Sequence, residues 1–281
     1  QIVGLWTFIK KMEIKMKFKC FFLMLIFFMI CSSMGYATEK RLTILHTNDL
    51  HSHFLGFSPN GDYSPQITGN DHTIGGWARI ATVIKSTKAE RKNPFLVLDA
   101  GDFLMGSLFH MVTREEALEL ALMQKMGFDL TTLGNHEFDL KPEGLARIIE
   151  SASANGKMPQ IVASNIIFDQ TDTADDRLEK LFKQGVVKPY VVLQKDELKI
   201  GFFGLTGKDA ADVAPFASPV KFGDSIETAQ KMVKLLREQE KVDVVVCLSH
   251  SGLMDDESKS EDVLLAKNVS GIDIIISGHT H

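Results

Sequence analysis

The sequence contains little cysteine: only Cys20, Cys31 and Cys247 occur among its 281 residues. The first two lie in an apolar N-terminal stretch that we expect to be removed, which would leave Cys247 alone. A single cysteine cannot form an intrachain disulfide or a cysteine-based zinc site. A chain of this length can bury a sizeable core without disulfides, so their absence is compatible with export to a bacterial periplasm or cell surface.

The sequence also lacks an excess of positive charge and a long apolar run. Its formal net charge is −5, and removing the N-terminal stretch, which holds five lysines and one glutamate, would make the rest more acidic. An acidic chain argues against a broad surface for binding a nucleic-acid polymer. The apolar stretch Cys20–Ile30 is shorter than the roughly 20 residues that span a bilayer. We therefore expect no stable membrane span after cleavage.

Residues 1–37 have the pattern of a secretory signal peptide. Basic residues precede the apolar stretch, and the small residues Gly35 and Ala37 occupy the −3 and −1 positions, which predicts cleavage after Ala37. The chain begins with glutamine, so we expect the natural start at Met16. The alternative is a lipoprotein acceptor at Cys31, which the bulky Ile30 before it disfavours. Either way, the pattern predicts an exported protein of the periplasm or cell surface.

After this leader, strand-like and helix-like segments alternate. We expect strands at 41–48, 95–98, 128–133, 160–164, 242–248 and 272–276, with an antiparallel pair at 188–194 and 198–205. We expect helices at 75–89, 113–126 and 262–268, one opening at Pro142, and one running from Asp224 to about Leu236. A capping box, Thr113-Arg114-Glu115-Glu116, opens the second of these helices. Continuously apolar strands are typical of sheets covered on both faces, so residues 38–281 are expected to form a layered α/β domain.

The stretch Gly134-Asn135-His136-Glu137-Phe138-Asp139 follows one of these strands. An Asn amide oxygen can ligate a metal, and an imidazole can give or take a proton near neutral pH. Asp139 could accept the other ring N–H of His136 and fix its tautomer. Taken alone, the stretch is equally compatible with an ordinary loop histidine and an aspartate that caps the next helix.

Other expected strands end in similar residues. Asp49 and His51 are two residues apart, which in an extended backbone would direct both side chains to one side. Asp102 follows Gly101, where the chain can turn sharply and present a carboxylate. The candidate metal ligands are Asp49, His51, Asp102, Asn135, His250, His279 and His281. This set could hold two divalent metal ions around one shared carboxylate and lower the pKa of a bridging water. The absence of a thiolate leaves zinc, manganese, iron and cobalt as candidates.

The order of these blocks resembles the calcineurin-like metallophosphoesterases. Asp49-x-His51, Gly101-Asp102, Gly134-Asn135-His136-Glu137, His250 and Gly278-His279-Thr280-His281 correspond to the family's five blocks. The stretches LTILHTNDLHSHF, GGWARIATVI and LGNHEFD are similar to the exported 5′-nucleotidase/UDP-sugar hydrolase branch. The resemblance implies a four-layer α/β/β/α sandwich and a nucleotide or other small phosphate ester as substrate.

The resemblance also implies a division of the ligands between two metals. Asp49, His51, Asp102 and His281 would hold one metal, and Asp102, Asn135, His250 and His279 the other. His136, held by Asp139, would be the transition-state stabiliser or general acid. It implies hydrolysis of nucleotides by attack of a metal-bound water.

Family members of full length continue past the last ligand with further strands and a C-terminal domain that stacks the nucleobase. We therefore expect residues 38–281 to be a catalytic domain truncated after the last metal-ligand strand, with the substrate domain absent. The alternatives are a 2′,3′-cyclic-nucleotide phosphodiesterase or sulfur-oxidation thiohydrolase of the same branch, and an inactive metal-binding fragment. The sequence gives no prediction of the oligomeric state.

Overall fold

The computed structural model describes residues 18–19, 22, 24, 39–56, 74–156 and 158–281. The expected cleavage site after Ala37 and most of the leader lie outside the described residues. The chain divides into two units, residues 1–40 and residues 41–281, and the second contains all the strands described. Among the described residues, no helix is both long and apolar enough to cross a bilayer.

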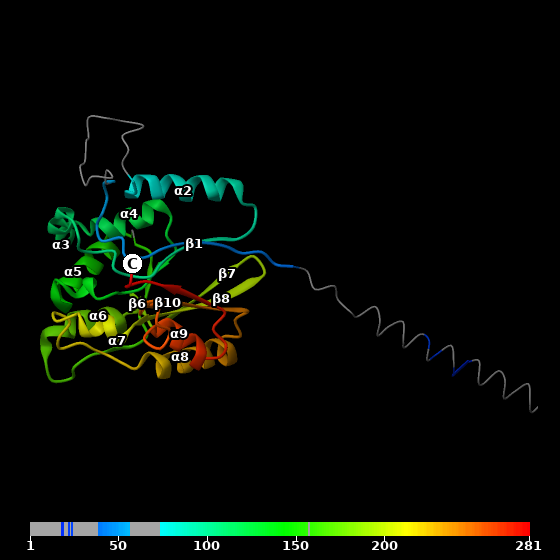
Figure 1. Ribbon diagram of the computed structural model, residues 1–281. Coiled ribbons are helices and arrows are strands. Elements are labelled where there is room, and N and C mark those ends of the chain that lie inside the picture. The colour runs from blue at the N-terminus through cyan, green and yellow to red at the C-terminus, as the bar shows by residue number, and fades with distance from the viewer. Residues whose placement is uncertain (1–17, 20–21, 23, 25–38, 57–73, 157) are drawn as a thin grey trace, which may run out of the picture. The chain divides into compact units, whose positions relative to one another are not determined.

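Two sheets form the centre of the unit 41–281 (Figure 1). The first is parallel, in the order β1 (Thr43–Thr47), β2 (Phe95–Asp99), β3 (Leu130–Thr131), β4 (Gln160–Val162) and β6 (Val187–Lys188). The second has the order β11 (Ile274–Ser277), β10 (Val244–His250), β8 (Leu198–Thr206) and β7 (Tyr190–Lys195). Its strands are parallel except for β7, which pairs with β8 antiparallel as the sequence predicted. A small antiparallel pair joins β5 (Ile166–Ile167) to β9 (Lys221–Phe222).

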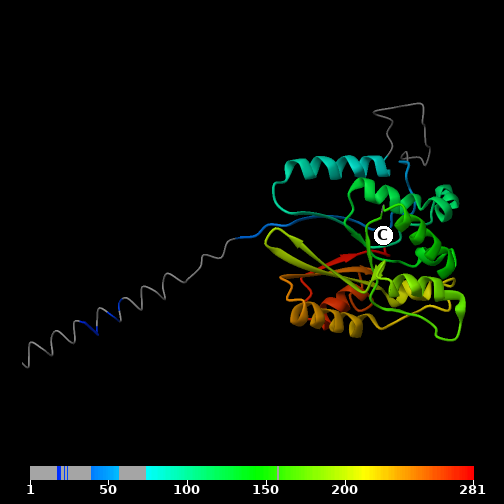
Figure 2. The same cartoon turned by 180° about the vertical axis from the view of Figure 1, so that it is seen from behind.

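Helices cover the outer face of each sheet, as Figures 1 and 2 show from opposite sides. The first sheet is covered by α2 (Trp77–Glu90), α4 (Leu118–Met126), α5 (Lys141–Ala154) and α6 (Asp176–Lys183). The second is covered by α8 (Ser225–Lys234) and α9 (Glu261–Asn268). The shorter helical elements are α3 (Thr113–Glu116), α7 (Lys208–Asp212), η1 (Leu108–Val112), η2 (His136–Phe138), η3 (Thr173–Asp175) and the π-helical η4 (Leu235–Gln239).

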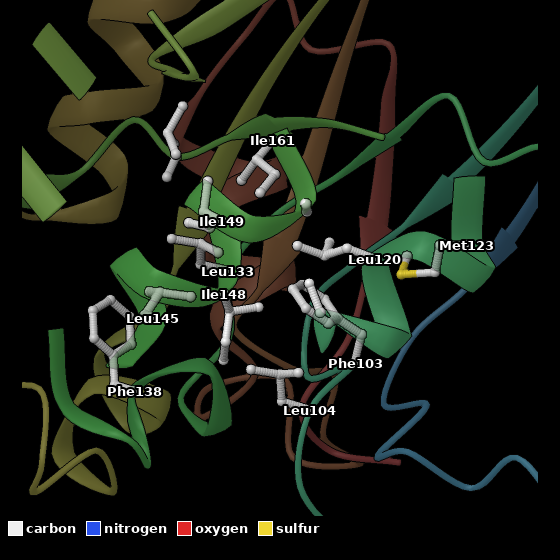
Figure 3. Packing of buried hydrophobic residues seen from close by; sticks show 14 of the residues in the cluster. Phe103, Leu104, Leu120, Met123, Leu133, Phe138, Leu145, Ile148, Ile149 and Ile161 are labelled. Carbon is white, nitrogen blue, oxygen red and sulfur yellow. The ribbon is translucent and has the colours of Figure 1, made fainter. Parts of the chain in front are cut away.

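Alternating side chains of the central strands divide the core into three clusters. In β2, Leu96 and Leu98 face the cluster between the two sheets, while Val97 faces the helices that cover the first sheet. In β10, Val246 faces the cluster between the sheets, and Cys247 faces the one beneath α8 and α9. Figure 3 shows part of the cluster beside the first sheet. Successive strand residues point to opposite faces, so three clusters require four layers, and the expected α/β/β/α fold is confirmed.

The helix expected over residues 113–126 is interrupted. Ala117 has a left-handed backbone, with φ of 47°, and separates α3 from α4. The Thr113 hydroxyl donates to the buried Glu119 carboxylate instead of capping the helix, and Ser52 donates to the same carboxylate. The predicted capping box is therefore wrong: the Thr113 hydroxyl satisfies the buried Glu119 carboxylate, and α3 has no side-chain cap. The Asp224 carboxylate caps α8 by accepting a 2.8 Å hydrogen bond from the Glu227 N–H.

Candidate metal centre

The predicted ligands collect where the parallel strands of both sheets end. Asp49 and His51 follow β1, and Asp102 follows β2. Asn135 and His136 follow β3, and His250 is the last residue of β10. His279 and His281 follow β11. Parallel strands present their carboxyl ends at one edge, which is where open α/β sheets place their binding sites.

The turns that carry these ligands are tighter than the sequence predicted. Asp49 and His51 have φ values of 52° and 46°, so the extended backbone expected between them is wrong. Asp102, His279 and His281 also have left-handed backbones. The loops after β1 and β2 run side by side, joined by the hydrogen bond from the His51 N–H to the Asp102 carbonyl oxygen, 3.0 Å. Such conformations are costly for residues other than glycine and concentrate at functional sites.

Asp49, His51 and His281 form the first group of potential ligands. The Nε2 atoms of His51 and His281 lie 3.1 Å apart, and Asp49 Oδ1 lies 3.8 Å and 3.6 Å from them. His51 Nδ1 lies 3.3 Å from the Leu104 carbonyl oxygen, which favours the tautomer whose Nε2 carries a lone pair toward the group. Burial lowers the pKa of His51, favouring the neutral imidazole that binds metals.

Asp102, His250 and His279 form the second group, and Asn135 adjoins it. His250 Nε2 lies 3.1 Å from Asp102 Oδ2 and 3.2 Å from Asn135 Oδ1. Burial alone would lower the pKa of His250, but hydrogen bonding to Asp102 and its charge raise it to about 9. His250 Nδ1 lies 2.8 Å from the Ala100 carbonyl oxygen, so the ring is fixed with Nε2 toward the group.

Asp102 lies between the two groups. A third cluster of ligand atoms joins it to His51 and His136, so its carboxylate is within reach of both sides of the site. Its Oδ2 faces His250, and its Oδ1 accepts a 2.9 Å hydrogen bond from the backbone N–H of His136. The seven predicted ligands thus lie close together, with the Asp102 carboxylate between the two groups.

His136 and Asp139 form the pair that the sequence predicted, with 2.7 Å between His136 Nδ1 and Asp139 Oδ2. The centroid of the His136 ring lies 5.2 Å from that of His51, with the planes at 77°. About a third of the His136 side chain is exposed, in contrast to the fully buried His250. Because Asp139 engages Nδ1, the other ring nitrogen of His136 is available to exchange a proton with a bound molecule.

Glu137 is a positioning residue that the sequence analysis missed. Its buried carboxylate accepts three backbone N–H bonds, from Asp102 at 2.9 Å, Gly134 at 2.6 Å and Leu104 at 3.0 Å. Burial, reinforced by the charge of Asp102, raises the pKa of Glu137 to about 8. This carboxylate ties the loop after β2 to the loop after β3. The only signal for this role in the sequence was the position of Glu137 next to His136.

Gly134 allows the closest approach in the site. A Cβ at this position would lie 2.2 Å from Asp102 Oδ1 and 2.7 Å from His250 Nε2. Gly101 combines a left-handed backbone, φ of 89°, with a similar approach, since its Cβ would lie 3.1 Å from His250 Nδ1. The absence of both side chains lets the loops close around the Asp102–His250 pair.

The donor set suits divalent metal ions. It consists of carboxylate oxygens, an amide oxygen and imidazole nitrogens, which are the usual ligands of zinc, manganese, iron and cobalt. The facing Nε2 atoms of His51 and His281 need a shared proton or a cation between them, because two imidazole lone pairs repel each other. The buried carboxylates of Asp49 and Asp102 lie beside these imidazoles and supply the negative charge that a cation requires.

Residues 42–281 match the calcineurin-like phosphoesterase family. The chain is 34% identical to the trifunctional nucleotide phosphoesterase protein YfkN of Bacillus subtilis (strain 168), over 85% of this chain and 16% of that protein. The structure of Haemophilus influenzae NAD nucleotidase superposes with a TM-score of 0.67 at 30% identity, covering 85% of this chain and 38% of the other. The structure of a 5′-nucleotidase precursor from Thermus thermophilus superposes with a TM-score of 0.66 at 31% identity, covering 85% of this chain and 41% of the other.

The chain spans about two fifths or less of the length of each of these relatives. The family match nevertheless covers the whole unit that contains both sheets and all seven candidate ligands. The chain therefore belongs to the calcineurin-like phosphoesterase family, and its relatives include 5′-nucleotidases.

Proposed function

We propose that the chain is a dinuclear metal-dependent phosphohydrolase that releases phosphate from nucleotides, in the manner of a 5′-nucleotidase. The observation that carries the proposal is the position of Asp102 between two groups of nitrogen and oxygen donors. A carboxylate between two such groups is the arrangement that a pair of metals in a phosphatase requires. The similarity to nucleotide-hydrolysing relatives supports nucleotides as the substrate class.

In this proposal Asp49, His51, Asp102 and His281 hold one metal, and Asp102, Asn135, His250 and His279 hold the other. When bound, the metals supply the Lewis acidity that activates water and neutralises the phosphoryl oxygens. The protein's part is to fix the ligands. The Ala100 and Leu104 carbonyl oxygens orient the His250 and His51 rings, and Glu137 holds the backbone of the loops.

His136 is proposed to act on the phosphate ester directly. Its ring is partly exposed and is held by Asp139, so the nitrogen opposite Nδ1 can face a bound leaving group or phosphoryl oxygen. There it would either donate a proton to the leaving oxygen or stabilise charge in the transition state. Asp139 would keep the ring in the required orientation and tautomer.

The experiment is a hydrolysis assay on the 281-residue chain, first stripped of metal and then supplied with zinc, manganese or cobalt. The proposal predicts metal-dependent release of inorganic phosphate from AMP, abolished by a chelator. Metal-dependent cleavage of 2′,3′-cyclic AMP without phosphate release from AMP would favour a phosphodiesterase. Metal binding without hydrolysis of AMP, cyclic AMP or a thiosulfonate substrate would favour an inactive metal-binding fragment.

We further propose that the protein is exported, on the basis of the basic, apolar and small-residue pattern in residues 10–37. N-terminal sequencing of the exported protein should therefore begin at Thr38. A chain beginning at a lipid-modified Cys31 and retained in a membrane fraction would contradict this cleavage site.

A further inference from the structure

Asp209, outside the predicted ligand set, lies against one of the proposed ligands. Its Oδ2 is 3.1 Å from Nε2 of His279. The backbone N–H of His279 is also held, by the two Asp49 carboxylate oxygens at 2.9 Å and 3.2 Å. A carboxylate at Nε2 favours a proton on that nitrogen and leaves the lone pair on Nδ1. One nitrogen of the His279 ring lies within reach of the ligand atoms of Asp102 and His250.

The helix that carries Asp209 is itself fixed to the site. The Glu261 carboxylate, at the start of α9, accepts hydrogen bonds from the backbone N–H groups of Lys208 and Asp209, both at 2.7 Å. The preceding Gly207 N–H donates to the carbonyl oxygen of His250 at 2.9 Å. The beginning of α7 is therefore connected to a ligand-bearing strand and to α9, which limits the positions that the Asp209 side chain can take.

The remaining side chains of α7 have a different environment. Lys208, Ala211 and Asp212 line a cavity of about 470 Å³ between α7, α8 and α9, and the Lys208 ammonium pairs with Asp212. Lys208 and Asp212 are both more than half exposed. The Asp209 side chain is also about half exposed, but unlike Asp212 it contacts His279, whose side chain is only 12% exposed. Asp212 is thus a matched control, since it is the same residue type on the same short helix.

We propose that Asp209 is a positioning residue that fixes the tautomer and orientation of His279 for the metal shared by Asp102, Asn135 and His250. Glu261 supports this role by holding the first turn of α7. The inference rests on the proposed metal centre and extends it to a carboxylate–histidine–metal arrangement. Partners of this kind typically contribute 10–100-fold to metal affinity.

The first test determines which ring nitrogen of His279 carries the proton in the metal-free protein. Long-range proton–nitrogen correlation spectra of the imidazoles should show His279 protonated at Nε2 in the unmodified chain. Asp209→Ala should lose this preference, and Asp212→Ala should keep it. A His279 ring protonated at Nδ1 in the unmodified chain would overturn the inference whatever the metals do.

The second test measures binding of zinc to each metal-free protein in competition with a chromogenic chelator. Asp209→Ala should weaken one of the two sites by about 10–100-fold and leave the other within about twofold. Asp209→Asn should weaken zinc binding less than Asp209→Ala, because its amide oxygen can still accept a hydrogen bond from the Nε2–H of His279. Asp212→Ala should bind zinc with the same affinity as the unmodified chain. The unfolding midpoints of the metal-free variants should agree, which separates loss of positioning from loss of folding.

Two outcomes distinguish this inference from the proposed function. If the unmodified chain binds two zinc ions and Asp209→Ala binds them with unchanged affinity, Asp209 has no positioning role and the metal centre stands. If the unmodified chain binds no zinc, the proposed function itself fails and the inference fails with it.

Discussion

His136 differs from His51 and His250 in the group that holds its ring. His51 and His250 are oriented by backbone carbonyl oxygens and face the ligand groups, whereas His136 is oriented by the Asp139 carboxylate at 2.7 Å. A carboxylate partner stabilises a ring that gains a proton during a reaction. The carboxylate partner and the partial exposure of the ring, about a third compared with 12% for His279, are together the physical reason for assigning His136 to proton transfer or charge stabilisation. The His136 ring also lies within reach of Asp102.

His136→Ala should therefore leave two metals bound and slow nucleotide hydrolysis by about 10²–10⁴-fold. Asp139→Asn should slow nucleotide hydrolysis less than His136→Ala does, since the imidazole remains but is less well oriented. The measurements are metal content per chain and steady-state hydrolysis of AMP. A p-nitrophenyl ester, whose leaving group needs no proton, should be less sensitive to His136→Ala if the role is general acid. Loss of a metal, or full activity on AMP, would contradict the assignment.

Gly134→Ala tests the close packing around Asp102. The added Cβ would lie 2.2 Å from Asp102 Oδ1, so the carboxylate or the loop must move. We expect the variant to bind metal at least tenfold more weakly, since a shift of the shared ligand disturbs both groups. Gly223→Ala is the control, because its Cβ would make only ordinary contacts, the nearest at 3.5 Å. Equal metal affinity in the two variants would show that the loop relaxes without cost.

At the level of single residues, the sequence predicted the ligand types and their places after strands. It did not predict their backbone conformations, because the left-handed turns depend on hydrogen bonds such as that from His51 N–H to the Asp102 carbonyl. Glu137 and Asp209 were missed for the same reason. Their partners Asp102 and His279 are 35 and 70 residues away in the chain.

Three neighbouring strands of the first sheet are joined at their carboxyl ends by Asp99. This residue ends β2 and accepts hydrogen bonds from Thr47 of β1 at 2.7 Å and from Thr131 of β3 at 2.8 Å. The Gly101 N–H is a third donor at 3.1 Å. Burial disfavours the charged carboxylate more than these donors favour it, and raises the pKa of Asp99 from 3.8 to about 7.

The raised pKa of Asp99 predicts a pH-dependent stability. Between about pH 4 and pH 7 the folded chain keeps a proton that the unfolded chain has lost, so this residue makes the free energy of unfolding fall as pH rises. The full shift corresponds to a few kcal/mol, on the order of 4 at most. The Asp99→Asn side chain cannot titrate, so the free energy of unfolding of this variant should decrease less as pH rises. Urea denaturation of the metal-free proteins from pH 4 to pH 8 measures this, and parallel curves would contradict the prediction.

At the level of elements, the sequence predicted strands more reliably than helix ends. The antiparallel pair β7–β8 is confirmed, because its two apolar runs are separated by a short polar turn. The single helix expected at 113–126 is instead two helices separated by the left-handed Ala117, and the expected Thr113 cap is wrong because its hydroxyl donates to the buried Glu119. The helix α6 was not expected at all. It begins within an acidic stretch, and its buried residues Leu178 and Leu181 pack on a core that the local pattern does not reveal.

At the scale of the whole unit, four layers serve to bring the ends of two sheets to one place. Asp49, Asp102 and Asn135 come from the first sheet, and His250 and His279 from the second. The cluster between the sheets, which includes Leu98 and Leu248, fixes the distance between these two sets. The proposed metal centre therefore depends on the packing of the whole unit, and Asp102 lies within reach of ligands from both sheets.

Metal content of the Asp102→Ala variant tests this account most directly. The unmodified chain, loaded with zinc and dialysed, should retain two metals, and His51→Ala should lose mainly one. Asp102→Ala should weaken both sites, because its carboxylate is the proposed ligand common to both. Retention of two metals by Asp102→Ala would contradict the shared-carboxylate centre.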